Sequence, residues 1–281
     1  MNIENPNPNT NEDMGAMVAL EDLKDVQAFG GDGKDTWMTG FDEKGEKKFI
    51  KTYDLKGPDS EYLANCLKRE AYCYKNIDLP VLPKMSGVNE KEGYLILDYI
   101  EDLSSLEPAN DDMDKLVDIS LNGFGSIDPA FLPKREDLAP VFDKIRGLRE
   151  EGHKFHQEAL GLIEKSEAEI ENNAKHFVHG DYILQNFKKN DKGEIFVFDY
   201  ELSSHGHLFS DLATLYVDLA FAREKQKYLF KKVSEHPEFK EDIFKALVLR
   251  RAIGQVYALR KNAPETRPMK TGLEVLASFG K

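Results

Sequence analysis

The stretch that decides the fold reads HFVHGDYILQN at positions 176–186, and EIFVFDYE follows it at positions 194–201. Asp181 and Asn186 lie five residues apart in a short loop after an apolar strand. In the second segment the side chains alternate between two faces, so Asp199 emerges where the strand ends. A glycine-containing turn joins the segments and predicts a hairpin, which brings Asp199 back beside the Asp181 loop.

These polar groups match what phosphoryl transfer to an alcohol requires. The reaction needs a carboxylate that orients the hydroxyl and accepts its proton, metal ligands for Mg²⁺ on the phosphates, and a cation near the phosphates. Taken singly, Asp181 and Asn186 are equally suited to a turn, and Asp199 to the end of a strand. The three residues together at these spacings favour chemistry.

Three motifs carry a resemblance to a known family. HGD at 179–181 with Asn186 matches the H-G-D-x-x-x-x-N motif of the aminoglycoside phosphotransferase and choline kinase-like family. DYE at 199–201 resembles the metal-binding strand end of that family, and SDLA at 210–213 is similar to its D-L-A helix start. The order of elements is similar over nearly the whole chain, but the resemblance is specific only between about 176 and 216.

The resemblance implies the roles of the central residues. Asp181 would be the catalytic base, and Asn186 and Asp199 would hold Mg²⁺, with ATP or GTP as the co-substrate. The implied fold class is α+β, a bilobal protein kinase-like fold with a small antiparallel β-rich N-lobe and a larger, mostly helical C-lobe. We expect His179 to brace the loop by hydrogen bonding rather than to act in the chemistry.

The N-terminal part alternates strands with turns and contains one helix. Its sequence predicts a meander of three antiparallel strands, then an amphipathic helix, then two further strands. The predicted ranges are 26–30, 36–41 and 48–53 for the meander, 58–77 for the helix, and 83–88 and 94–99 for the last two strands.

A lysine and a glutamate are predicted to pair in this part of the chain. Lys51 shares a strand face with two aromatic residues, and Glu70 lies on the apolar stripe of the helix. A lone carboxylate that faces a core is unfavourable, so Glu70 requires a partner. Lys51 would satisfy it, as the phosphate-binding lysine and its helix glutamate do in kinases. The alternative places Glu70 at the edge of the stripe, in solvent.

Two other segments are predicted to contact the nucleotide. Gly31 and Gly33 belong to a glycine-rich loop that would cover the phosphates, since glycine permits close approach of the backbone. A plain hairpin turn would have the same sequence. The resemblance also implies that the backbones of Asp98 and Ile100 meet the adenine edge, while a buried strand without that role explains the same residues.

The rest of the chain is mainly helical. Helices are expected at 138–148, 155–170, 210–232 and 239–261, with short strands between 176 and 197. We therefore predict a disordered tail at 1–13, a nucleotide-binding lobe at 14–102, and a catalytic and acceptor-binding lobe at 103–281.

The acceptor is predicted to be a small hydroxyl compound. Protein kinases dock peptides on a long activation segment, whereas here the Asp211 motif follows Asp199 by only twelve residues and no D-F-G sequence is present. Acidic runs in the C-terminal part suit a polycation such as an aminoglycoside, or an amino alcohol, but solvated helix faces look the same. The alternatives are a kinase-like regulatory or binding module without transfer, and a kinase that acts on a protein.

Composition restricts the partners further. The formal net charge of −13 argues against wide contact with nucleic acid, and no apolar run is long enough to span a bilayer. The two cysteines, Cys66 and Cys73, lie seven apart on one predicted helix, too far for a disulfide. Two unpaired thiols predict a cytoplasmic protein.

Overall fold

The computed structural model describes residues 17–31, 35–129, 132, 141–259 and 266–279, so the predicted tail at 1–13 lies outside the described residues. The chain forms two compact units. Unit 1 comprises Met1–Leu67 and Pro83–Tyr99, and unit 2 comprises Lys68–Leu82 and Ile100–Lys281. Among the described residues, no helix is both long enough and apolar enough to cross a membrane.

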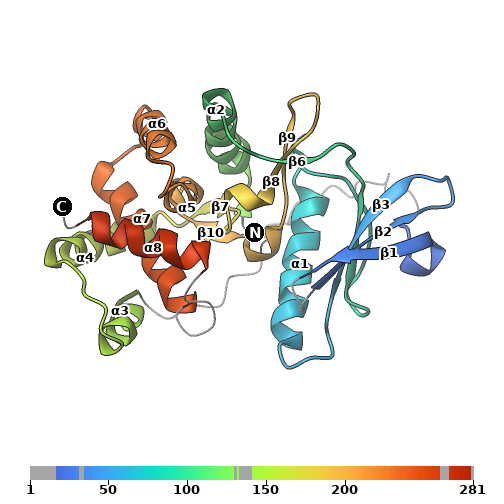
Figure 1. The fold of residues 1–281 in the computed structure, drawn as a ribbon, viewed down its shortest axis with the longest axis horizontal. Coiled ribbons are helices and arrows are strands. Elements are labelled where there is room, and N and C mark those ends of the chain that lie inside the picture. The colour runs from blue at the N-terminus through green and yellow to red at the C-terminus, as the bar shows by residue number, and fades with distance from the viewer. Residues whose placement is uncertain (1–16, 32–34, 130–131, 133–140, 260–265, 280–281) are drawn as a thin grey trace, which may run out of the picture. The chain divides into compact units, whose positions relative to one another are not determined.

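Unit 1 contains a five-stranded antiparallel sheet in the order β1-β2-β3-β5-β4 (Figure 1). The strands are β1 (Lys24–Gly30), β2 (Asp35–Phe41), β3 (Lys47–Tyr53), β4 (Met85–Asn89) and β5 (Tyr94–Asp98). All five predicted strands are confirmed, and the predicted meander is β1, β2 and β3.

The register of the sheet sets which side chains share a face. In the pairing of β3, Lys51 lies opposite Trp37 of β2 and Leu95 of β5. Ile50 and Ile96, which also pair, are fully buried and form the core of this unit with Leu23 and Tyr94. Period-two alternation on β3 therefore separates the core face from the face that carries Lys51.

Helix α1 (Ser60–Asn76) contributes residues to both units. Its apolar stripe is buried as the sequence predicts, with Leu67 and Cys73 fully enclosed. Cys66 and Cys73 are both free and buried. Glu70 is only 2% exposed, which rules out the alternative that places it in solvent.

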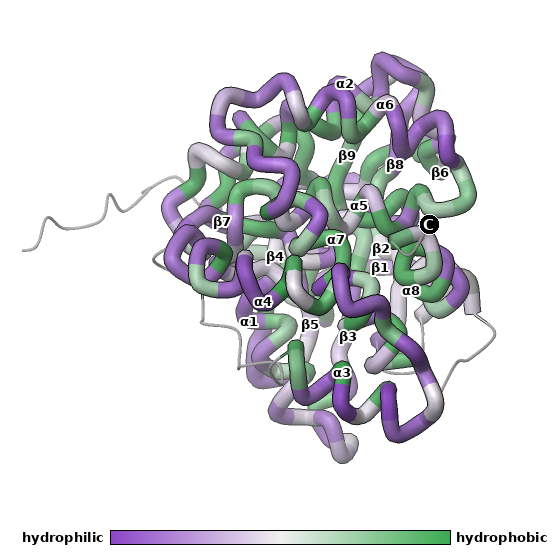
Figure 2. Tube along the Cα trace, turned by 90° about the vertical axis from the view of Figure 1, so that its left-hand side faces the viewer, coloured by the Kyte–Doolittle hydropathy of each residue, from purple (hydrophilic) through white to green (hydrophobic). Residues whose placement is uncertain are grey.

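Unit 2 is built mostly from helices. These are α2 (Asn110–Asp118), α3 (Val141–Glu150), α4 (Gln157–Asn172), α5 (Ser210–Asp218), α6 (Arg223–Ser234), α7 (Glu241–Leu259) and α8 (Arg267–Ser278). Figure 2 shows mostly hydrophobic colour along α7, whose buried residues come from every side of the helix. Burial on several sides is typical of a helix in the middle of a core.

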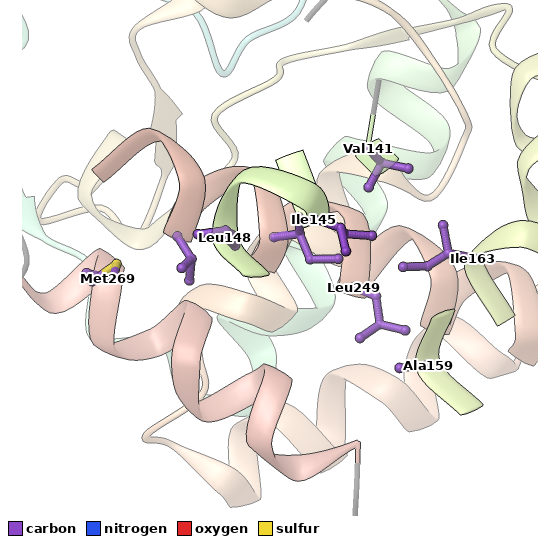
Figure 3. Packing of buried hydrophobic residues seen from close by; sticks show 9 residues of the cluster. Val141, Ile145, Leu148, Ala159, Ile163, Leu249 and Met269 are labelled. Carbon is purple, nitrogen blue, oxygen red and sulfur yellow. The ribbon is translucent and has the colours of Figure 1, made fainter. Parts of the chain in front are cut away.

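The core around α7 is formed by four helices (Figure 3). Val141, Ile145 and Leu148 of α3 and Ile163 of α4 meet Leu249 of α7 in one cluster. Met269 brings α8 into the same cluster. Complete burial of such a side chain contributes about 1.5–3 kcal/mol, so this cluster anchors α7 firmly.

One predicted helix is wrong, and helix α2 was not predicted. The helix expected at 210–232 is two helices, α5 and α6, separated by a turn in which Ala222 N–H donates to the Leu219 carbonyl at 2.7 Å. The amide of Gln226 donates to the Tyr216 carbonyl at 3.0 Å and so satisfies a carbonyl near the end of α5. Helix α8 was not expected at all.

Two small sheets in unit 2 hold the loop that carries Asp181 and Asn186. β7 (His176–Val178) pairs with β10 (Ser204–Gly206), and β8 (Phe187–Lys189) pairs with β9 (Ile195–Val197). The turn between β8 and β9 is closed by hydrogen bonds between Asn190 and Glu194 and between Gly193 and Asn190. The predicted hairpin is therefore confirmed.

Candidate active site

The loop that holds Asp181 is fastened to helix α5 through its backbone. The two carboxylate oxygens of Asp211 accept hydrogen bonds from the N–H groups of His179, at 2.8 Å, and Gly180, at 3.0 Å. Burial raises the pKa of Asp211, while the two N–H groups favour its ionised form. At the other end of the loop, Leu184 N–H donates to Asp218 of α5 at 2.9 Å.

His179 braces the loop, as predicted. Its ring is fully buried, with Nε2 2.9 Å from the Phe198 carbonyl and Nδ1 3.3 Å from the N–H of Asp181. Both contacts are satisfied when the proton is on Nε2, because that nitrogen then donates and Nδ1 accepts. His179 thereby ties the Asp181 loop to the residue that precedes Asp199.

Glycine is required at position 180. Gly180 has φ of +83°, and a Cβ atom there would lie 2.2 Å from the carbonyl oxygen of Leu202. Any other side chain would displace backbone, since that distance is far below van der Waals contact. The H-G-D sequence thus has a geometric basis in this chain.

The carboxylate of Asp181 is held by two side chains. Asn186 donates from Nδ2 to Oδ2 of Asp181 at 3.1 Å, and from the same nitrogen to the Asp181 carbonyl at 2.8 Å. Arg251 donates from one terminal nitrogen to Oδ1 at 2.8 Å. Asp181 and Asn186 therefore lie together, and Arg251 of α7 lies with them.

Aromatic side chains pack against the loop that carries Asp181. Tyr182 is fully buried and donates from its hydroxyl to the Leu116 carbonyl at 2.7 Å. Its ring meets Phe187 edge to face at a centroid distance of 4.6 Å, and His179 lies 4.6 Å from Tyr200. Burial raises the pKa of both Tyr182 and Tyr200 well above the usual range. The tyrosine at position 182 is therefore a structural anchor.

Asp199 adopts an unusual backbone conformation directly after β9. Its φ of 68° and ψ of 65° place it in the left-handed region, which is unfavourable for a residue with a Cβ atom. The preceding residue, Phe198, donates from its N–H to the Asn186 carbonyl at 3.0 Å. The strand end is thus hydrogen-bonded to the loop, and the strained backbone sets the direction of the Asp199 carboxylate.

Three carboxylates of unit 2 form a cluster at this strand end. Oxygens of Glu70, Asp199 and Glu201 all lie within 4.8 Å of one another. Arg69 donates to the Glu201 carbonyl at 2.7 Å and so holds the backbone that carries the third member. Carboxylate oxygens are the ligands that Mg²⁺ prefers, and a cation would relieve the repulsion between them. The donor set therefore fits Mg²⁺.

Asn186 is also suited to hold a metal ion. Its amide nitrogen is used twice on Asp181, which leaves the amide oxygen as the atom with ligand capacity. Among the predicted site residues in unit 2, Asp181 and Asn186 are in direct contact, and Asp199 is joined to them through the Phe198–Asn186 hydrogen bond.

Two of the predicted nucleotide-binding residues, Lys51 and Gly31, lie in unit 1. Lys51 is 6% exposed, with its ammonium 3.8 Å from Asp35 and 5.0 Å from the ring centre of Tyr53. Its predicted pairing with Glu70 stays a prediction. Gly31 has φ of +136°, and a Cβ there would lie 2.3 Å from the Asp35 carbonyl. Gly33 lies outside the described residues.

The segment predicted to meet adenine begins at the end of β5. The N–H of Asp98 donates to the Lys84 carbonyl at 2.8 Å, and its side chain bonds Ser86 and Lys48. The Asp98 carboxylate is therefore used within the sheet, and the predicted contact of the Asp98 and Ile100 backbones with adenine stays a prediction. Ile100 is half-buried and belongs to unit 2.

Sequence reasoning missed Arg251. It lies 70 residues from Asp181 in the chain, so no local spacing links the two. One signal was present: Arg250 and Arg251 stand side by side in a helix whose neighbouring residues are almost all apolar. Glu201 was noticed as part of a motif, and the structure adds that its carboxylate joins Glu70 and Asp199.

No family model matches the chain, and no curated protein sequence does. Solved structures do match over most of its length. The choline kinase LicA from Streptococcus pneumoniae has a TM-score of 0.60 at 17% identity, with 92% of this chain and 94% of that chain covered. The aminoglycoside phosphotransferase APH(4)-Ia has a TM-score of 0.63 at 12% identity, with 92% and 93% covered.

This chain has the fold of the choline kinases and aminoglycoside phosphotransferases. An ethanolamine kinase from Plasmodium vivax shares this kinase-like fold, with a TM-score of 0.56 at 13% identity over 93% of this chain and 82% of that one. The predicted α+β, protein kinase-like fold class is confirmed by these matches, by the five-stranded antiparallel sheet and by the mostly helical part that follows.

Some structures with this kinase-like fold hold nucleotides. LicA has been solved with AMP, and APH(4)-Ia in ternary complexes with hygromycin B and either ADP or AMP-PNP. The APH(4)-Ia complexes therefore hold a nucleotide and hygromycin B together on this fold.

Proposed function

We propose that this protein is a Mg²⁺-dependent phosphotransferase that moves the γ-phosphate of ATP or GTP to a hydroxyl of a small molecule. The observation that carries the proposal is the placement of Asp181. Its carboxylate is held by Asn186 in a loop that Asp211 fixes to α5 and that His179 ties to the residue before Asp199. A fixed carboxylate beside a set of metal ligands is what phosphoryl transfer to an alcohol needs.

Asp181 has the role of catalytic base in this proposal. The acceptor hydroxyl hydrogen-bonds to its carboxylate, and the hydroxyl oxygen forms a bond to the γ-phosphorus as the bond to the β–γ bridging oxygen breaks. The hydroxyl proton passes to Asp181, and ADP or GDP leaves with the bridging oxygen. The rate enhancement from Asp181 comes mainly from positioning, since this carboxylate does not have to move during the reaction.

Asn186 and Asp199 are proposed as ligands of Mg²⁺, with Glu201 and Glu70 beside Asp199. When bound, Mg²⁺ neutralises charge on the phosphates and supports their orientation. The remaining predicted contacts belong to the nucleotide: Lys51, paired with Glu70, for the phosphates, Gly31 and Gly33 for the loop over them, and the backbones of Asp98 and Ile100 for the base.

A kinase-like binding module without transfer is the second candidate. Against it stands the fact that each central position of the motif holds a residue with the required chemistry and that the described contacts support those residues. Transfer to a protein side chain is disfavoured by the short distance in sequence between Asp199 and α5, which leaves little room for a peptide platform.

The test is a screen of nucleotide consumption against hydroxyl compounds, combined with Asp181→Ala. Sugars, hydroxy acids, choline, amino alcohols and aminoglycosides form the panel, and mass spectrometry of the product checks for one added phosphate. With an active acceptor, Asp181→Ala should lower kcat by about 10²-fold or more while Mg·ATP binding is retained. ATP consumption that is unchanged by the substitution would contradict the proposal.

A further inference from the structure

Arg251 occupies the oxygen of Asp181 that is not bound by Asn186. The terminal nitrogen of Arg251 lies 2.8 Å from Oδ1 of Asp181, while Asn186 donates to Oδ2. The two side chains of this ion pair are 25% and 23% exposed, so solvent and a ligand can reach both. The carboxylate of the proposed base therefore forms an ion pair with a guanidinium that is itself partly accessible.

The guanidinium has donor capacity beyond this ion pair. An arginine has five N–H donors in a planar fork, and the bond to Asp181 comes from one terminal nitrogen. Its Nε is buried without a hydrogen-bond partner among the described residues, so the donor capacity for a ligand rests on the N–H groups of the two terminal nitrogens. A planar donor fork with spare N–H groups is suited to bind the oxygens of a carboxylate or phosphate.

The neighbouring charged groups have other partners. Both oxygens of Asp211 are used by loop N–H groups, and Asp218 accepts from Leu184. Arg250, the next residue on α7, turns to Glu167 and Glu171 of α4. Arg251 thus differs from Arg250 in its contacts: Arg250 joins two helices, whereas Arg251 contacts the carboxylate that is proposed to bind the acceptor hydroxyl.

We propose that Arg251 is an acceptor-binding residue that selects hydroxyl compounds carrying an anionic group, a carboxylate or phosphate, near the reacting hydroxyl. This rests on the proposed function, and it replaces the aminoglycoside and amino alcohol acceptors that the acidic runs of the sequence suggested. A cation at this place would meet the positive guanidinium, and the negative charge of Asp181, which would attract it, is already paired. An anionic group satisfies the guanidinium and leaves the Asp181 oxygen to the hydroxyl.

The experiment uses three matched probes that share one polyol chain and differ only in the group at one terminal carbon. They are D-gluconate, which is anionic, D-glucitol, which is neutral, and 1-amino-1-deoxy-D-glucitol, which is cationic. Binding is measured by titration calorimetry without nucleotide, and kcat/KM is measured with Mg·ATP. The proteins are the wild type, Arg251→Gln, Arg251→Lys, and Arg250→Gln as the matched control.

The wild type should bind gluconate about 10-fold or more tighter than the amine, the size expected for charge-assisted hydrogen bonds. This ratio should fall close to one in Arg251→Gln, be partly kept in Arg251→Lys, and be unchanged in Arg250→Gln. A purely structural role would weaken all three probes alike. The inference is overturned if the amine binds as well as gluconate, if gluconate shows no Arg251-dependent binding, or if the ratio survives in Arg251→Gln.

The two measurements separate this inference from the proposed function. Arg251-dependent binding of gluconate without phosphate transfer to any compound of the hydroxyl panel would support the charge selection and count against the kinase. Phosphate transfer to the amine that is insensitive to Arg251→Gln would overturn the charge selection and leave the kinase in place.

Discussion

Two neighbouring regions of unit 2 are built on opposite principles. The loop of Asp181 has its polar groups satisfied by the protein: His179, Gly180 and Leu184 donate to α5, and the loop carboxylate is bound from both sides. The strand end of Asp199 instead gathers three carboxylates within 4.8 Å. One region holds a single carboxylate in place, whereas the other brings three carboxylates together.

The loop of Asp181 serves to position a base, whereas the strand end of Asp199 is suited to bind a cation. A base must be held in place before the substrate arrives, so its loop is rigid and buried in aromatic rings. A metal site is stabilised by the ion itself, so the protein can keep like charges together there. We therefore expect substitutions in the loop to disturb the protein under all conditions, and substitutions in the cluster to act mainly through Mg²⁺.

The largest effect is expected for Asp211→Ala. The substitution leaves the buried N–H groups of His179 and Gly180 without their acceptor, and each such group destabilises by about 1–3 kcal/mol. Activity should fall about 10²-fold or more as the Asp181 loop shifts. Thermal unfolding and kcat check this. Asp211→Asn should lose less, because its amide oxygen still accepts from one of the two N–H groups while its NH2 group faces the other. Equal stability of wild type and Asp211→Ala would refute the account of the loop.

The second-largest effect, on thermal stability, is expected when Mg²⁺ is removed. An ion present at 100 times its dissociation constant stabilises the folded protein by about 2.7 kcal/mol, equal to about 5–10 °C in Tm for a chain of this length. Asp199→Asn should lose most of this Mg²⁺-dependent increase. Melting curves with Mg²⁺ and with EDTA check the prediction, and Asp112→Asn serves as a carboxylate control on α2. An increase that persists in Asp199→Asn would place the ion elsewhere.

Tyr182→Phe should have a smaller effect that does not depend on the metal. It removes the hydroxyl that donates to the Leu116 carbonyl and keeps the ring packing. The expected loss is about 1–2 kcal/mol, with the same loss in Mg²⁺ and in EDTA. Chemical denaturation under both conditions measures it. A loss that appears only with Mg²⁺ would mean that the two regions are coupled.

The smallest effect on intrinsic stability is expected for Glu201→Gln. Without Mg²⁺, the relief of repulsion from Glu70 and Asp199 offsets lost contacts, so stability should change by less than about 1 kcal/mol. With Mg²⁺, the affinity for the ion should fall about 10-fold. Titration of Mg²⁺ by calorimetry tests this, and an unchanged affinity would remove Glu201 from the ligand set.

The parts of the structure that the sequence predicted are those with local causes. The five strands follow from alternation and turn residues, and Asp181, Asn186 and Asp199 come together through one short hairpin. Gly180 could be recognised because the motif is contiguous, and its positive φ explains why. Local periodicity and short turns are sufficient for such features.

The features that were missed depend on tertiary contacts. Residues 219–222 contain no glycine or proline, so nothing local separates α5 from α6, and the bond from Gln226 to Tyr216 is visible only in the fold. Arg251 reaches Asp181 because packing of α7 against α3, α4 and α8 places it there. Distance along the chain hides contacts of this kind from pattern analysis.

The buried thiols have a practical consequence. Cys66 and Cys73 are the only cysteines of the chain, and burial raises the pKa of the Cys73 thiol to about 12. Both should therefore stay unreactive toward maleimides in the folded protein at neutral pH, where alkylation requires an accessible thiolate. A cysteine placed at Phe221, which is 60% exposed, would accept a single fluorophore on the native background. Such a label would report ligand binding without prior removal of natural cysteines.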